Sequence, residues 1–166
     1  MSKKRVNISG DPSERKLDVA SIAEIRGRII DRFVLIESDL NYLLTNHFNP
    51  SNDLEGFKKI MLNSSILTYG SKVKLLFSLG VIENKLKEQL YQLGNIRNAF
   101  AHLSVKHSVS VNYFPASNTS EIDQSATIEV LHANGNLAKK DAYQWAKDFT
   151  AIEKSALKKL KIIREQ

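Results

Sequence analysis

The sequence contains no cysteine, and this absence excludes several kinds of site. Without thiols the chain can form no disulfide framework, no thiolate zinc site and no cysteine nucleophile. Three prolines and seven glycines among 166 residues are too few for a low-complexity linker protein. No apolar run approaches the roughly 18 residues of a transmembrane helix, and the first residues lack the apolar stretch of a signal peptide. We therefore expect a cytoplasmic protein with no membrane partner.

Positive charge is in excess but unevenly distributed. The chain has 24 Lys and Arg against 18 Asp and Glu, a net charge of +6. Residues 1–16 carry five basic and two acidic side chains, and residues 138–166 carry eight and four. We predict a flexible basic arm over residues 1–16, followed by a single domain over residues 17–166. The basic ends favour contact with polyanions, although a solvated tail and a solvated helix face explain the same charges.

The apolar pattern predicts a mainly α fold. Apolar residues recur every three or four positions from residue 22 to residue 43, which indicates a long helix that ends before Asn49-Pro50. Further helical patterns cover residues 54–62, 71–80, 85–103 and 138–163, with Ser71 as an N-cap and Gly80 as a C-terminal cap. Residues 108–114 and 127–132 are β-like. We predict an antiparallel helical bundle with a small β-hairpin insertion, about residues 104–137, before the last helix.

The predicted helix over residues 85–103 has a polar edge opposite its apolar face. At about 100° per residue, this edge contains Tyr91, Asn95, Asn98 and His102. Arg97 lies on the flank, about 140° from His102. A histidine opposite the core face is either an ordinary surface residue or part of a contact with something else. A contact with a second copy of the chain would bring two sets of these side chains together.

The residue types in this cluster suit phosphate chemistry. Histidine exchanges protons near neutral pH. Arginine binds phosphate oxygens and stabilises charge on a reacting phosphorus, and asparagine orients a hydroxyl or a phosphate. Together they favour metal-independent RNA cleavage, in which the 2′-hydroxyl attacks its own 3′-phosphate. Because Arg97 and His102 do not converge on one helix, this mechanism needs a dimer or a distorted helix end.

The segment Arg97-Asn98-Ala99-Phe100-Ala101-His102 resembles the signature of the HEPN superfamily, in which a histidine follows an arginine after four to six positions. With the run Tyr69–Ile82, it is similar to the mannitol operon repressor (MltR-like) branch, over about residues 20–103. The resemblance implies an all-helical homodimer with the Arg-His motif at the dimer cleft. Many members are RNases in toxin–antitoxin and antiphage systems. Others are regulators or binding modules, and the MltR-like branch carries a transcription-repressor label.

The leading hypothesis is a metal-independent endoribonuclease, or a descendant that still binds RNA. His102 would be the general acid and base, Arg97 would stabilise the phosphate, and Asn98 would position it. Tyr91 and Asn95 would line the cleft. The alternative is a non-enzymatic regulator of transcription or a protein-interaction module in which the same motif holds the dimer together. Its partner would be a regulatory protein, whereas a toxin would have an antitoxin.

Some HEPN proteins add an acidic or hydroxyl group from an earlier helix, and Glu37 is our choice for that role over Glu24, Asp31 and Ser38.

We predict no cofactor and no metal, because the scattered histidines and carboxylates lack the spacing of metal ligands. Weak candidates for contact with nucleic acid lie on the last helix: Lys154, Lys158 and Lys161. No short turn joins two basic helices, so the sequence does not predict direct DNA binding.

Overall fold

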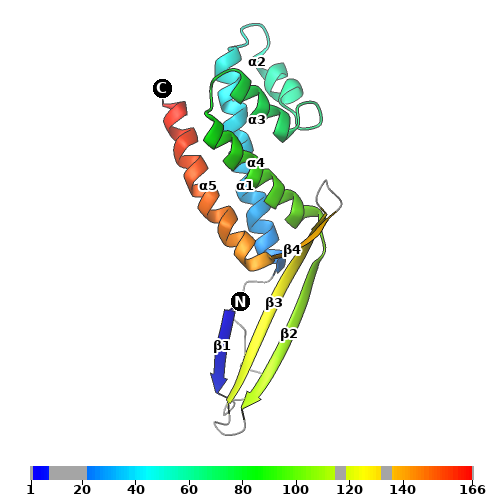
Figure 1. The fold of residues 1–166 in the computed structure, drawn as a ribbon. Coiled ribbons are helices and arrows are strands. Elements are labelled where there is room, and N and C mark those ends of the chain that lie inside the picture. The colour runs from blue at the N-terminus through cyan, green and yellow to red at the C-terminus, as the bar shows by residue number, and fades with distance from the viewer. Residues whose placement is uncertain (1, 8–21, 115–118, 132–135, 166) are drawn as a thin grey trace.

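The computed structural model describes residues 2–7, 22–114, 119–131 and 136–165. The protein is mainly helical, with an antiparallel sheet that extends from one end of the helical part (Figure 1). Its helical elements are α1 (Ile22–Phe48), α2 (Leu54–Gly56), the π-helical turn η2 (Phe57–Met61), α3 (Tyr69–Ser78), α4 (Asn84–His102) and α5 (Ala142–Arg164). Within the described residues, no helix is both long enough and apolar enough to span a bilayer.

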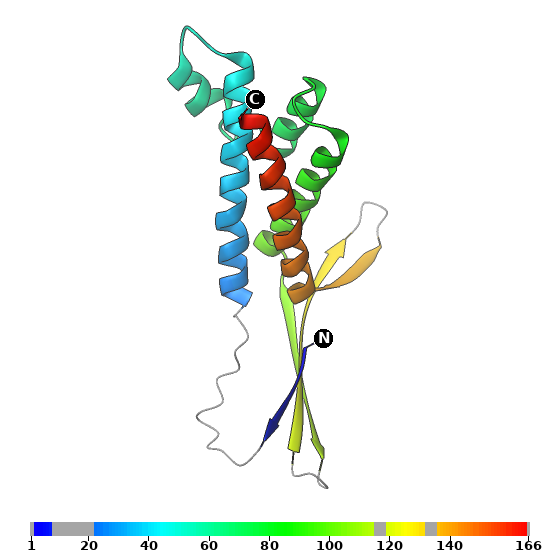
Figure 2. The same cartoon turned by 90° about the vertical axis from the view of Figure 1, so that its left-hand side faces the viewer.

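Helix α1 is the central element of the helical part. Its apolar residues recur at helical spacing and are buried: Ile22, Ile25, Ile29, Phe33, Ile36, Leu40, Leu43 and Leu44. This stripe packs against α3, α4 and α5, and Figure 2 shows α5 in front of α1 and α4. The helix ends at Phe48, and Asn49 has a positive φ of 39° immediately before Pro50. The predicted end of the first helix is confirmed.

The boundaries of the other helices follow local capping chemistry. Gly80 has a φ of +73°, a conformation that favours glycine and closes the end of α3. The N-cap of α3 is Thr68 rather than the predicted Ser71, because the Thr68 hydroxyl accepts the Ser71 backbone N–H. The last helix begins at Ala142 rather than about residue 138, since Asp141 caps it through the Gln144 N–H at 2.8 Å.

The sheet contains β1 (Ser2–Asn7), β2 (Val105–Phe114), β3 (Thr119–Leu131) and β4 (Leu137–Asp141). Strand β3 pairs antiparallel with the other three strands. The expected hairpin is therefore present as β2 and β3, but β1 and β4 enlarge it. Ala126 and Ile128 are buried where β3 meets the helices, and this alternation of apolar residues attaches the sheet to the helical core.

Strand β1 lies within the segment for which the sequence predicted a flexible arm. Its residues are mostly basic and polar and have no apolar alternation, so its sequence lacks a strand pattern, and the pairing with β3 defines the strand. Residues 8–16 of the predicted arm lie outside the described residues.

A buried ion pair fixes α1 against α5. Both carboxylate oxygens of Glu153 lie 2.6 Å from Nε of Arg32, and the Glu153 side chain is fully buried. A buried carboxylate is costly without a partner, so this contact ties the position of α5 to that of α1.

Candidate functional site

The polar edge of α4 faces solvent, as the helical wheel predicts. Tyr91, Asn95, Asn98 and His102 are exposed, whereas the apolar face of the same helix is buried in the core. The predicted site residues on this edge are thus accessible from outside.

A pocket of about 380 Å³ opens beside this edge, between α1, α4 and the start of α3. It brings together five of the six residues that the sequence predicts for the site: Glu37, Tyr91, Asn95, Arg97 and Asn98. His102, the sixth, does not line it. The remaining lining residues are Phe33, Ser64, Thr68, Tyr69, Gly70 and Gly94.

Arg97 is half-buried in the wall of the pocket and turned toward α1. Its guanidinium carbon lies 5.3 Å from the ring centroid of Phe33, a cation–π contact. Its Nη1 donates to Oδ1 of Asn98 at 2.9 Å. Its Nε is buried and has no hydrogen-bond partner among the described residues. The positive charge is therefore held in place with part of its donor capacity unused.

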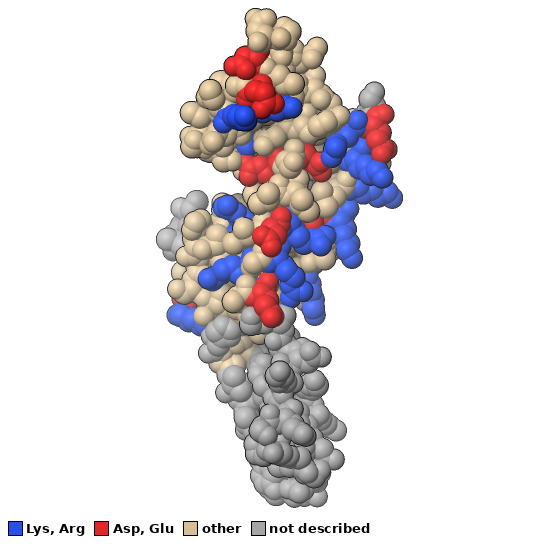
Figure 3. All heavy atoms as spheres, turned by 180° about the vertical axis from the view of Figure 1, so that it is seen from behind, with Lys and Arg blue, Asp and Glu red and all other residues tan. Residues whose placement is uncertain are grey.

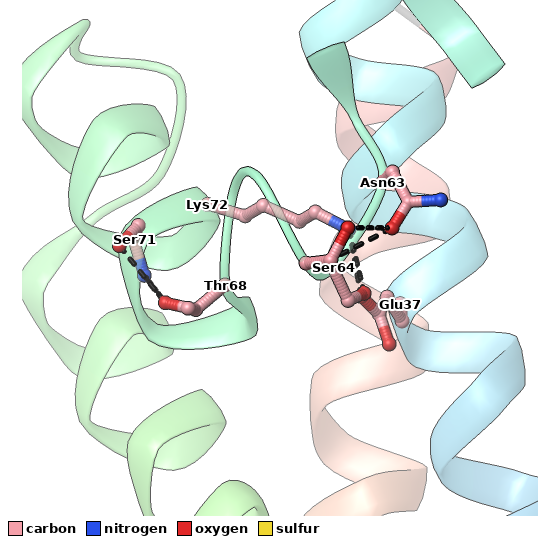
Figure 4. Close-up of polar contacts among 7 residues, drawn as sticks. Glu37, Asn63, Ser64, Thr68, Ser71 and Lys72 are labelled. Atoms are coloured by element: carbon pink, nitrogen blue, oxygen red, sulfur yellow. Dashed lines mark hydrogen bonds and ion pairs between the residues drawn. The ribbon is translucent and has the colours of Figure 1, made fainter. Parts of the chain in front are cut away.

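Glu37 lies on α1 at the floor of this region, where it pairs with Lys72 of α3 (Figure 4). The Lys72 Nζ donates to Oε1 of Glu37 at 2.6 Å, and the Ser64 hydroxyl donates to the same oxygen. The Lys72 side chain is only 1% exposed and that of Glu37 is 21% exposed. Glu37 thus lines the same pocket as Arg97, but its closest contacts are with Lys72 and Ser64 rather than with His102.

Lys72 is a residue whose role the sequence analysis missed. Figure 4 shows its side chain reaching from α3 across to Ser64 and Glu37. A single lysine beside the apolar residues of a short helix gives a weak signal, because most lysines at such positions extend into solvent. Only the position of α3 against α1 identifies its partner.

The ion pair changes the acidity of Glu37. Burial alone would raise its pKa, but hydrogen bonds from Lys72 and Ser64 and the charges of Lys72 and Arg97 outweigh burial and lower the pKa. A carboxyl group whose pKa is lowered by folding stabilises the fold above its unfolded pKa of about 4.3. That stabilisation is lost as the pH falls through the lower, folded-state pKa.

We therefore expect the free energy of unfolding to decrease as the pH falls below about 4.3, with a shallower dependence in Glu37→Gln than in the wild type. Urea unfolding of both proteins, between neutral pH and about pH 3, measures the two slopes. The same slope in both proteins would contradict the contribution assigned to Glu37.

Tyr69 packs under the pocket against α4. Its hydroxyl donates to the Leu90 carbonyl at 2.9 Å, and its ring centroid lies 4.4 Å from that of Phe33. Burial, and to a lesser extent the charge of Glu37, raises the pKa of Tyr69, so it stays a neutral donor. A Cβ at Gly94 would lie 3.0 Å from Cε1 of Tyr69, so a larger residue at this position of α4 requires the Tyr69 ring to shift.

Two glycine substitutions in helices test that close approach. Gly27 of α1 is exposed and has open space, so Gly27→Ala is expected to stabilise the protein by about 1 kcal/mol. Gly94→Ala has the same helix-propensity gain but displaces Tyr69, and we expect it to be less stable than Gly27→Ala by at least about 1 kcal/mol. Urea denaturation compares the two, and equal gains would show that the Tyr69 ring moves aside without cost.

His102 is the last residue of α4 and is exposed. Nearby, Nη2 of Arg26 on α1 donates to the carbonyl of Leu103 at 3.2 Å, which attaches the end of α4 to α1. Arg26 precedes the motif by more than 70 residues, so no local pattern links the two in the sequence. The structure thus places a second arginine, Arg26, near the end of α4 at which His102 lies.

The three lysines predicted as weak nucleic-acid contacts are exposed on α5. Lys161 lies 3.8 Å from the Glu165 carboxylate, whereas Lys154 lines a groove between α1 and α5. None of the three lines the pocket beside Arg97.

Within the described ranges, no three His, Asp or Glu side chains gather in a way that could hold a metal ion. Comparisons with protein-family models, curated proteins and solved structures found no match.

Proposed function

We propose that this protein is a HEPN-type, metal-independent endoribonuclease that acts as a homodimer. The observation that carries the proposal is the exposed His102 on the same edge of α4 as Asn98, whose side chain accepts a hydrogen bond from the guanidinium of Arg97. A nuclease needs such an imidazole open to solvent, so that it can meet a phosphate. The resemblance of residues 97–102 to the HEPN signature supports the same reaction.

The reaction is an internal displacement at phosphorus. The RNA 2′-hydroxyl loses its proton to a base and attacks the adjacent phosphate, while the leaving 5′-oxygen takes a proton from an acid. The products are a 2′,3′-cyclic phosphate and a 5′-hydroxyl end. In each site one His102 takes the proton from the 2′-hydroxyl and then gives it to the leaving 5′-oxygen, Arg97 stabilises charge on the phosphate oxygens, and Asn98 orients the phosphate.

The arrangement within one chain supports the need for a second copy. Arg97 lines the pocket beside α1, whereas His102 lies beyond the pocket at the end of the helix. A symmetric contact along the exposed edge of α4 supplies each site with the arginine of one copy and the histidine of the other. Exposed Tyr91 and Asn95 continue this edge and would line the cleft.

A second candidate is the regulator or protein-interaction module that the MltR-like resemblance implies. The observation in its favour is that Arg97 already has partners, in Phe33 and Asn98, and has a carboxylate, Glu37, in the same pocket. An arginine used in this way would stabilise the fold and a dimer contact. Asn98 and His102 would then bond across the two-fold axis, and the partner would be a regulatory protein.

Cleavage of total RNA and tRNA in EDTA by the purified full chain tests the first candidate. We expect wild-type protein to cut RNA, and His102→Ala and Arg97→Ala each to reduce the rate at least about 100-fold. His47→Ala is the matched control, because His47 is exposed at the far end of α1 and should cut like the wild type.

The oligomeric state of the variants separates the two candidates. A nuclease loses activity in His102→Ala but stays dimeric, whereas in the regulator the same substitution weakens the dimer. Intact RNA in the presence of a folded, dimeric wild type would contradict the nuclease proposal for these substrates.

A further inference from the structure

A groove of about 630 Å³ lies between α1 and α5, separate from the pocket beside Arg97. Its floor is formed by buried Ile25, Ile29 and Phe149. Half-buried Ala146 and exposed Ala151 leave room on the α5 side because their side chains are small. The groove therefore offers an open apolar channel bounded by two helices.

Every charged residue that lines this groove is cationic. Arg28 and Arg32 come from α1, and Lys147 and Lys154 from α5. Glu153 neutralises Arg32, but Arg28, Lys147 and Lys154 form no ion pair with any described residue. Figure 3 shows Lys and Arg gathered along the α5 side of the helical part. With positive charge on both sides of an apolar floor, the groove is complementary to a ligand that carries both acidic and apolar groups.

We propose that this groove binds an acidic amphipathic segment of a partner protein, with apolar side chains on the floor and Asp or Glu side chains on the rim. The two rim lysines of α5 are seven residues apart, about 10 Å along the helix. This length accommodates about two turns of a helical peptide, whose acidic residues at a spacing of three or four reach the cations. The inference is independent of the nuclease proposal, because it uses none of the α4 residues.

The groove fits a peptide better than RNA. RNA-binding surfaces present exposed aromatic rings on which bases stack. Here Phe149 is buried beneath the groove and Tyr143, the other aromatic residue that lines it, is half-buried, so neither ring is exposed as a stacking platform. The apolar channel would stay uncovered beneath a phosphate backbone, whereas aliphatic side chains of a peptide would cover it.

Selection from a displayed library of random 12-residue peptides on the full chain tests the proposal. We expect enrichment of peptides with Asp or Glu flanking apolar residues at a helical spacing. The tightest one, made synthetically, should bind at least about tenfold more weakly to Lys147→Glu/Lys154→Glu and to Thr150→Trp, by fluorescence anisotropy. Thr150 is exposed and lines the groove, so tryptophan fills the channel without changing its charge.

The matched control is Lys158→Glu/Lys161→Glu, which makes the same charge change on exposed positions of the same helix, outside the groove. It should bind the peptide with no more than a small loss. The proposal would be overturned if the selection did not enrich acidic peptides, or if the control variant bound the peptide as weakly as Lys147→Glu/Lys154→Glu. A single-stranded RNA oligonucleotide that binds more tightly than the peptide and requires Lys147 and Lys154 would overturn it in favour of a nucleic-acid surface.

Discussion

Mixing Arg97→Ala and His102→Ala proteins is expected to restore RNA cleavage that neither variant has alone. In the proposed dimer each site takes its arginine from one copy and its histidine from the other. A mixed dimer therefore contains one site with both native residues and one site with neither. Random exchange makes about half of the dimers mixed, so the mixture should reach about a quarter of wild-type activity. Each variant alone should have about one hundredth or less.

The control for this experiment is a mixture of His102→Ala with the double variant Arg97→Ala/His102→Ala. No dimer in this mixture has a native histidine, so its activity should stay at the level of His102→Ala. Equal, low activity in both mixtures, after exchange of subunits has been verified, would show that the two residues do not act across a dimer contact.

Removal of the Glu37 carboxylate is expected to destabilise the protein by about 3 kcal/mol, because Glu37→Ala leaves the charge of Lys72 buried without its partner. In a chain of this length that corresponds to a fall in melting temperature of about 6–12 °C. Replacement of both partners, in Glu37→Leu/Lys72→Met, removes the buried charge as well. We expect this variant to be more stable than Glu37→Ala.

The matched control is the ion pair between Lys159 and Glu83, which has the same 2.6 Å separation but an exposed carboxylate. Glu83→Ala should cost far less stability than Glu37→Ala, because the Glu83 carboxylate is solvated. Calorimetry or urea unfolding compares the three variants. Equal losses in Glu37→Ala and Glu83→Ala would contradict the assigned role of the buried lysine.

The long helices were predictable because their signals are local. The apolar stripe of α1, the proline after it and Gly80 at the end of α3 each act within a few residues. The exposure of the α4 edge followed from helical geometry for the same reason. Thr68 and Ser71 are both suitable N-cap residues for α3, and only the structure shows that Thr68 is the one that caps the helix.

Contacts between elements that are distant in sequence could not be predicted in this way. Lys72 reaches Glu37 over 35 residues, and Arg26 reaches the end of α4 over 77. Strand β1 pairs with β3 across more than 100 residues, and its basic sequence carries no period of two. In each case the partner is set by packing, for which a single sequence contains no direct signal. The sequence therefore identified five residues of the pocket but not the lysine beneath it.

The chemical ends that the protein leaves on RNA test the central claim most directly. After incubation of tRNA with the purified full chain in EDTA, the proposed reaction predicts fragments with 2′,3′-cyclic phosphate and 5′-hydroxyl ends. These fragments should be absent with His102→Ala. Intact tRNA and total RNA with a folded, dimeric wild type, or fragments with 5′-phosphate ends, would contradict the claim that His102 and Arg97 carry out this displacement.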